Sequence, residues 1–164
     1  MTVIQGLHHN AYRCRDAEET RAFYEDFLGL KLVHAFEIHE TKTGRDTRVL
    51  HLFFQMDDGS CLAFFEAPDN PFEFKKQHDY DLHIALQVTR DDMMAMFEKG
   101  KAAGIETRGV ANHHFIESIY FRDPNGYVIE LTAPTPEAPD ILAKAKGEAR
   151  GVVDNWQATK PSAV

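Results

Sequence analysis

Two histidines and one glutamate form the clearest chemical pattern in this sequence. His9 and His83 each open a short apolar segment, and a glycine follows 20 residues after the first histidine and 21 residues after the second. Glu130 closes the second copy of this pattern. Repetition at this length indicates two copies of one structural unit. Two imidazoles and one carboxylate are the ligands of a 2-His-1-carboxylate metal site, so the pattern predicts a metal centre.

The segments around these residues follow the same order twice. An apolar strand pattern is followed by an amphipathic helix and three further strands, which predicts an α+β fold of two βαβββ modules. Asp16 with Glu19 has the spacing of a capping box and should begin the first helix. The modules span residues 1–67 and 80–133, and a proline-containing linker at 68–81 joins them. The expected strands are 6–15, 30–39, 49–56, 61–67, 82–88, 104–110, 115–121 and 127–132.

Beyond the repeat, residues 134–164 form a C-terminal tail that is expected to be partly helical. Three prolines lead into a helix pattern at residues 140–150, and Trp156 in the polar remainder is expected to dock on other parts of the protein. This helix could pack against the domain edge or onto a second subunit.

Composition excludes several classes of function. The net charge of -8 argues against nucleic acid and anionic membranes as partners, because both require clustered lysine and arginine. Apolar runs are of strand length, so no segment is expected to span a bilayer. The first seven residues lack the features of a signal peptide, and we expect a cytoplasmic protein. The cysteines, Cys14 and Cys61, are too few for a disulfide scaffold and are expected to be buried thiols.

Several short pieces, in order and at the expected spacing, resemble the vicinal oxygen chelate superfamily, which includes glyoxalase, bleomycin resistance proteins and extradiol dioxygenases. The resemblance covers about residues 5–133 and implies that the two modules pair into a curved mixed sheet around a metal cavity, within a homodimer. The matching pieces are Leu7-His8-His9, Ala22-Phe23-Tyr24, Leu28-Gly29-Leu30, Leu82-His83-Ile84-Ala85, Tyr120-Phe121-Arg122-Asp123-Pro124-Asn125-Gly126 and Ile129-Glu130-Leu131.

The resemblance selects His9 rather than His8 as the first ligand. In the family the ligand lies seven residues before the aspartate that starts the helix, and His9 has that relation to Asp16. His8 should then lie on the other face of the strand or at the mouth of the site, because successive strand residues point to opposite faces. The implied metal ligands are therefore His9, His83 and Glu130.

The first module lacks the carboxylate that the second module carries. Glu130 lies four residues after Gly126, and the residue four after Gly59 is Ala63. Glyoxalase I and methylmalonyl-CoA epimerase carry a Glu or Gln ligand in that strand, so this chain departs from them. Glu66 is the nearest carboxylate and is expected to be a solvent-facing strand end. Three protein ligands leave open positions on an octahedral ion.

This ligand count favours an Fe(II) extradiol-type dioxygenase that cleaves a catechol or a hydroquinone-like substrate. Those enzymes are similar in their His, His, Glu set and in a tyrosine ten residues before the glutamate, which Tyr120 matches. Mn(II), Zn(II) and Ni(II) are the alternative metals.

Three other functions stay open. A glyoxalase-like lyase or isomerase usually needs a fourth ligand. A fosfomycin-type thiol transferase uses two His and one Glu, but no phosphonate-binding cations are identifiable. The third alternative is a metal-free binding protein of the bleomycin-resistance kind.

Other residues are candidates for proton transfer and substrate binding. By strand alternation His114 and Ser118 share a face with Tyr120, so His114 is the first catalytic candidate, His113 the second, and Ser118 a substrate contact. Tyr120 could equally be a core aromatic. Arg13 shares strand parity with His9 and could bind an anionic group. Four further histidines are expected at surface or ordinary polar positions: His34, His39, His51 and His78. Two arginines, Arg45 and Arg48, are expected to form exposed ion pairs.

Overall fold

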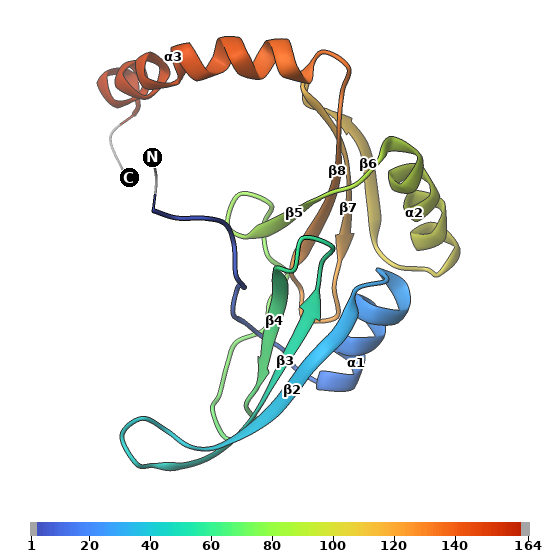
Figure 1. The fold of residues 1–164 in the computed structure, drawn as a ribbon, viewed down its shortest axis with the longest axis vertical. Helices are drawn as coiled ribbons and strands as arrows, with labels where there is room; N and C mark the ends of the chain where they lie inside the picture. Colours follow the sequence, from blue (N-terminus) through green and yellow to red (C-terminus); the bar gives the residue numbers. More distant parts are fainter. Residues whose placement is uncertain (1–2, 162–164) are drawn as a thin grey trace. The chain divides into compact units, whose positions relative to one another are not determined.

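The computed structural model describes residues 3–161 and contains the predicted βαβββ order twice, followed by a long C-terminal helix (Figure 1). The first module consists of β1 (Tyr12–Arg13), α1 (Ala17–Arg21), a π-helical continuation η1 (Ala22–Phe27), β2 (Lys31–Glu40), β3 (Asp46–Gln55) and β4 (Cys61–Glu66). The second consists of β5 (His83–Gln87), α2 (Arg90–Ala102), β6 (Thr107–Asn112), β7 (Ile116–Arg122) and β8 (Val128–Pro134), and α3 (Ala138–Thr159) follows. The strands form two four-stranded sheets, in the orders β1-β4-β3-β2 and β5-β8-β7-β6.

The first helix begins where the capping residue predicts. The backbone N–H of Glu19 donates to the Asp16 carboxylate at 2.8 Å, which satisfies one of the donors that a helix start leaves unpaired. Gly29, with φ of +87°, ends the helical segment in a conformation that glycine adopts most easily. The helical segment buries Tyr24 completely, and its ring packs against Phe54 and Phe64 of the sheet.

The first sheet has two apolar faces of different composition. Leu52, Phe54, Leu62 and Phe64 are buried on the face that packs against the helical segment containing Tyr24. The residues that alternate with these along β3 and β4 point to the opposite face. The antiparallel pairs Phe53↔Ala63 and His51↔Phe65 lie on that face.

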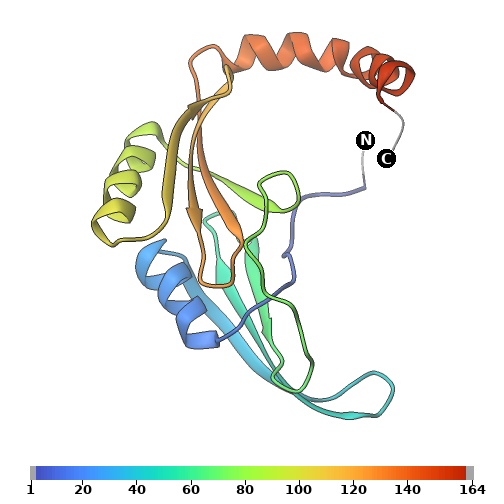
Figure 2. The same cartoon turned by 180° about the vertical axis from the view of Figure 1, so that it is seen from behind.

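In the second module, α2 lies along its sheet (Figure 2). The Thr89 hydroxyl accepts from the N–H of Asp92 at 3.1 Å and caps the helix. Gly100 lets the helix approach the strands closely, because a Cβ there would lie 2.5 Å from the Phe121 ring and 2.6 Å from the Thr107 hydroxyl.

The turn between β7 and β8 is built into the first of two compact units. Unit 1 comprises Met1–His83 with Arg122–Ile129, and unit 2 comprises Ile84–Phe121 with Glu130–Val164. Within unit 1, the buried Asp123 carboxylate accepts hydrogen bonds from the Tyr24 hydroxyl and from the backbone N–H groups of Asn125 and Tyr127. Burial raises the pKa of Asp123, although these donors oppose the shift. The corresponding turn of the first module, at Asp57, Asp58 and Gly59, is exposed.

Some elements differ in length from the sequence-based predictions. The first strand is only two residues long, with an isolated bridge from His9 to Cys61, and β3 begins three residues early. The C-terminal helix runs from Ala138 to Thr159 rather than over 140–150, because Pro139 fits its first turn and no other proline follows before Pro161. Trp156 was expected to dock but is 60% exposed. Residues 162–164 of the tail lie outside the described residues. Within residues 3–161, no helix is long and apolar enough to cross a membrane.

Candidate metal centre

His9 stands at the edge of the first sheet, beside a second imidazole. It forms a parallel bridge with Cys61, and its ring centroid lies 5.3 Å from that of Phe53. The Nδ1 atoms of His8 and His9 are 2.7 Å apart, so one ring donates to the other. If His9 donates, its Nε2 carries the lone pair that a metal ligand requires. His8 therefore contacts the predicted ligand directly.

His83 is held by the end of the linker. Its Nδ1 lies 2.6 Å from the carbonyl oxygen of Asp79, and since a carbonyl only accepts, Nδ1 carries the proton. The lone pair of the neutral ring is then on Nε2. Donation of the other ring nitrogen to a backbone carbonyl is the usual support for a metal-ligating histidine.

Glu130 lies in β8 of unit 2, and only 5% of the residue is exposed. A buried carboxylate is costly unless it is bonded or coordinated to a metal. By strand alternation Glu130 shares a face with Thr132, whose hydroxyl lies 3.2 Å from that of Ser118. The opposite face carries the buried Ile129 and Leu131.

The structure explains why the first module offers no fourth ligand. Ala63 is fully buried and pairs with Phe53. Glu66 is three positions further along β4, so it points to the other face of the sheet. Its carboxylate accepts from the N–H of Ala17 at 2.7 Å, at the start of α1. Glu66 ends β4 as expected, but it is half-buried rather than solvent-facing, because its carboxylate bonds to the start of the helix.

Tyr120 contacts His113, the second of the two histidine candidates. The Tyr120 hydroxyl lies 2.8 Å from Nε2 of His113. His114 precedes the strand rather than extending it, since β7 begins at Ile116, and the φ of His114 is +71°. The prediction that His114 lies on the same strand face as Tyr120 was therefore wrong. Ser118 is fully buried and bonded to Thr132, as described above.

Arg108 is a cation that the sequence analysis missed. It pairs across the strands with Tyr120, and its guanidinium lies 5.3 Å from the centre of that ring. The position of Arg108 beside Tyr120 follows only from the register of β6 against β7, which the sequence does not specify.

Arg13 has the predicted parity, because it pairs with Phe65 on the face that His9 shares. Its guanidinium donates to the carbonyl oxygens of Ala67 and Asn70 and lies over the Phe72 ring. Arg13 therefore holds the start of the linker, beside a cavity of about 160 Å³.

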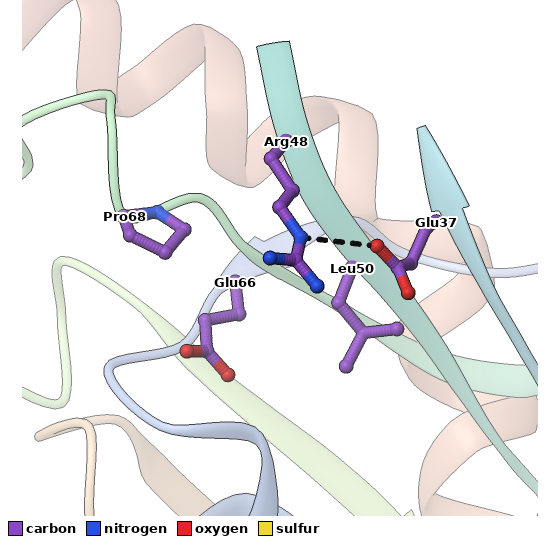
Figure 3. Close-up of a pocket in the computed structure, with 5 residues that line it drawn as sticks. All are labelled: Glu37, Arg48, Leu50, Glu66 and Pro68. Carbon is purple, nitrogen blue, oxygen red and sulfur yellow. Dashed lines mark hydrogen bonds and ion pairs between the residues drawn. The ribbon is translucent and has the colours of Figure 1, made fainter. Parts of the chain in front are cut away.

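A second cavity, of about 260 Å³, is lined by Glu37, Arg48, Leu50, Glu66 and Pro68 (Figure 3). Arg48 donates to Glu37 at 3.1 Å, and 76% of its side chain is exposed, which confirms the predicted surface ion pair. By strand parity Leu50 and Glu66 face away from Ala63, so this cavity is separate from the His9 face.

His51 was expected at an ordinary polar position but is 5% exposed. Its Nδ1 donates to the carbonyl oxygen of Phe64 at 2.9 Å, and its ring stacks on Phe65 at 3.7 Å. Burial lowers the pKa of His51, which favours the neutral ring. The apolar residues on both sides of His51 in the sequence were the signal for a strand with two covered faces.

No three His, Cys, Asp or Glu side chains among residues 3–161 lie close enough together to hold one metal ion. His9 and His83 belong to unit 1 and Glu130 to unit 2. The ligand set His9, His83 and Glu130 therefore stays a prediction.

Comparison with known proteins agrees with the architecture. Residues 6–131 match the sequence model of the Glyoxalase/Bleomycin resistance protein/Dioxygenase superfamily. The chain is 29% identical over 132 residues to the metallothiol transferase FosB of Bacillus licheniformis, covering 78% of this chain and 75% of that protein. It is 26% identical over 129 residues to the glutathione transferase FosA of Serratia marcescens, covering 79% and 81%.

Solved structures with the same fold include the fosfomycin resistance protein FosX of Listeria monocytogenes in complex with Mn(II) and sulfate. It aligns with a TM-score of 0.61 and 25% identity over 84% of this chain and 98% of that one. A mutant of FosX with Mn(II) and 1S,2S-dihydroxypropylphosphonic acid aligns with a TM-score of 0.60 at the same identity and coverage.

Proposed function

Because the chain belongs to the Glyoxalase/Bleomycin resistance protein/Dioxygenase superfamily, we propose that it is a metal-dependent enzyme that adds a thiol or water to a small oxygen-rich substrate. The observation that carries this proposal is the similarity to two thiol transferases, each over about four fifths of the chain. Addition of a thiol or water therefore replaces Fe(II)-dependent ring cleavage as the favoured reaction.

The residues that would hold the metal are His9, His83 and Glu130. Two neutral imidazoles and one carboxylate suit Mn(II), which relatives of the FosX type bind, and also Fe(II), Zn(II) and Ni(II). The hydrogen bond from His83 to Asp79 and the contact between His8 and His9 support this assignment, since each can fix a ring with its lone pair on Nε2. A bound divalent ion would supply Lewis acidity at a substrate oxygen.

The thiol would come from a second substrate. Burial raises the pKa of the Cys14 thiol to about 12 and also raises the pKa of Cys61. A buried thiol of raised pKa is a poor nucleophile at neutral pH.

Tyr120 and His113 would move the proton. Their contact at 2.8 Å would allow the tyrosine hydroxyl to give its proton to a developing oxyanion while Nε2–H of His113 returns a proton to the tyrosine oxygen. Arg108, above the Tyr120 ring, would bind an anionic substituent such as a phosphonate or carboxylate. Ser118 and Arg13 stay weaker substrate candidates, because their polar groups bond to Thr132 and to the linker.

Oxygen-dependent cleavage of a catechol or hydroquinone with Fe(II) is a second candidate. The observation that favours it is the hydrogen-bonded Tyr120, which lies ten residues before Glu130, the predicted third metal ligand.

Metal analysis followed by two activity panels separates the candidates. Protein purified without added metal is analysed for bound metal, then loaded with Mn(II) or Fe(II). Thiol consumption is followed with fosfomycin and glutathione or cysteine, water addition to fosfomycin is followed without thiol, and oxygen uptake is followed with catechols. Thiol or water addition that Glu130→Ala abolishes supports the main proposal. Oxygen uptake that the same variant abolishes selects the second candidate. Absence of metal binding would contradict both.

We also infer that the chain forms a homodimer. The support is α3, which presents Leu142, Val152, Val153 and Trp156 at exposures of 50% or more, since a long helix with an exposed apolar side gains stability by association. Sedimentation of the full chain against a chain ending at residue 137 tests this inference. We expect a dimer that dissociates on truncation.

A further inference from the structure

The cavity of about 160 Å³ beside Arg13 has two arginines in its wall, Arg13 and Arg15, with the buried Cys14 between them in the sequence. Most of the other lining residues come from the start of the linker, and they include Phe72 and Phe74. We call this cavity the arginine pocket, after Arg13 and Arg15. All of its residues belong to unit 1, so its geometry does not depend on the second module.

Each arginine of the pocket lies over a phenylalanine of the linker. The guanidinium carbon of Arg13 is 5.2 Å from the centre of the Phe72 ring, and that of Arg15 is 5.2 Å from the centre of the Phe74 ring. The two rings contact each other edge to face, with their centroids 4.9 Å apart. A guanidinium that lies over a ring keeps the N–H groups in its own plane available for hydrogen bonds. The rings therefore hold two cations without using their donors.

Much of the hydrogen-bonding capacity of these arginines is unused within the protein. Nη2 of Arg13 donates to the carbonyl oxygens of Ala67 and Asn70, whereas Nε of Arg13 is buried without an acceptor. Within residues 3–161 the guanidinium of Arg15 has no hydrogen-bond acceptor. Since an arginine offers five N–H donors, both side chains retain donors for a ligand.

The arginine pocket also carries an excess of positive charge. Glu66 is the one carboxylate among the described residues that line it, and this carboxylate already accepts from the N–H of Ala17 at 2.7 Å. The Cys14 thiol is neutral at pH 7, because burial raises its pKa to about 12. Neither Arg13 nor Arg15 forms an ion pair with an acid of residues 3–161. An anion in the pocket would therefore be attracted by both arginines.

The arginine pocket is separate from the predicted metal centre. His9 forms a bridge with Cys61, and Arg13 pairs with Phe65, at the other end of the same strand, β4. Four residue positions along a strand correspond to about 13 Å. A small ion in the pocket therefore does not reach the metal ligand His9.

We propose that the arginine pocket binds a small oxyanion, the phosphate or carboxylate group of a metabolite, at a site distinct from the metal. Guanidinium groups match the geometry of these oxyanions, and hydrogen bonds between charged partners are among the stronger ones. Both arginines are held before the anion arrives, because Arg13 pairs with β4 and the backbone N–H of Arg15 donates to Oδ1 of Asn125 at 2.7 Å. Such preorganisation lowers the entropic cost of binding.

Titration of the chelator-treated, full-length protein tests the proposal, with inorganic phosphate and acetate as the probes at constant ionic strength. We expect saturable binding by calorimetry and a matching rise in Tm, because a ligand that binds only the folded state stabilises it. Tighter binding of phosphate assigns the pocket to a phosphate group, and tighter binding of acetate assigns it to a carboxylate. Saturable binding of neither probe would overturn the proposal. Because no metal is present, this result is independent of the proposed function.

Three variants locate the bound anion. Arg15→Gln should weaken binding at least about fivefold, because it removes a charged donor. Phe74→Leu should weaken binding about threefold without changing the charge, because it removes the ring beneath Arg15. Arg48→Gln is the matched control and should leave the affinity unchanged, since it removes the same charge from an exposed side chain that lines the other cavity.

The pattern of losses decides whether the anion occupies the arginine pocket. Losses in Arg15→Gln and Phe74→Leu that are absent from Arg48→Gln support the proposal. Equal losses in Arg15→Gln and Arg48→Gln would show a response to net charge alone and would overturn it. A loss confined to Arg108→Gln would place the anion beside Tyr120 and would overturn it as well.

Discussion

The two modules place different residues at corresponding positions. Glu130 in the second module corresponds to Ala63 in the first, and both residues are buried. His83 bonds to a backbone carbonyl, whereas His9 contacts another histidine. Around His9 the sheet carries phenylalanine and histidine, while β7 and its β6 neighbour carry Tyr120 and Arg108. The repeat therefore keeps the positions of the histidines but not their surroundings, which are apolar and aromatic around His9 and carry the polar pair Tyr120 and Arg108 in the second module.

Removing the carboxylate should have the largest effect. Glu130→Ala should lower the affinity for Mn(II) at least about 100-fold and the activity about 1,000-fold, because the single anionic ligand of the predicted three-ligand site is lost. Metal titration followed by EPR measures the affinity. Glu98→Ala, at an exposed position of α2, is the control. An unchanged affinity in Glu130→Ala would show that the modules do not differ in this way.

The two hairpin turns should differ almost as strongly in their contribution to stability. Asp123→Ala leaves the Tyr24 hydroxyl and two backbone N–H groups without their acceptor in a buried site, which should cost about 3 kcal/mol of unfolding free energy. Asp57→Ala, in the exposed turn of the first module, should change it by less than about 0.5 kcal/mol. Urea denaturation measures both. Similar losses in the two variants would contradict the asymmetry.

The repeat order, the first helix cap and the absence of a carboxylate at Ala63 were all predictable, because each depends on local spacing or on alternation within one strand. The burial of His51 was predictable only in part, because the apolar residues around it indicate a covered strand but do not specify the contact with Phe65 or the hydrogen bond to Phe64. The position of His114 depended on where a strand begins, and boundaries are set by tertiary contacts. The contact between Arg108 and Tyr120 required a strand register that no turn residue specifies.

The next-largest expected effect distinguishes His113 from His114 as the histidine that takes part in the reaction. Tyr120→Phe and His113→Gln should each lower the rate of the catalysed reaction about 100-fold, because the structure joins these two groups. His114→Gln should change the rate by less than about threefold, since the contact with the Tyr120 hydroxyl is made by His113. Rates are compared at saturating metal. A larger loss in His114→Gln than in His113→Gln would restore the original order of candidates.

The support of His9 by His8 should have the smallest effect. His8→Ala should weaken Mn(II) binding about tenfold, because it removes the partner of the predicted ligand's second ring nitrogen. His39→Ala, an exposed histidine of β2, serves as the control. If the two variants bind Mn(II) equally well, His8 has no part in orienting His9.

Electron spin-echo spectroscopy of the Mn(II)-loaded protein tests the division between the modules most directly, because it counts the histidine nitrogens bound to the ion. The account predicts two, falling to one in His9→Ala and in His83→Ala, and unchanged in His51→Phe. Three bound histidines, or a count that His51→Phe lowers, would place His51 of β3 in the metal site and contradict the ligand set His9, His83 and Glu130.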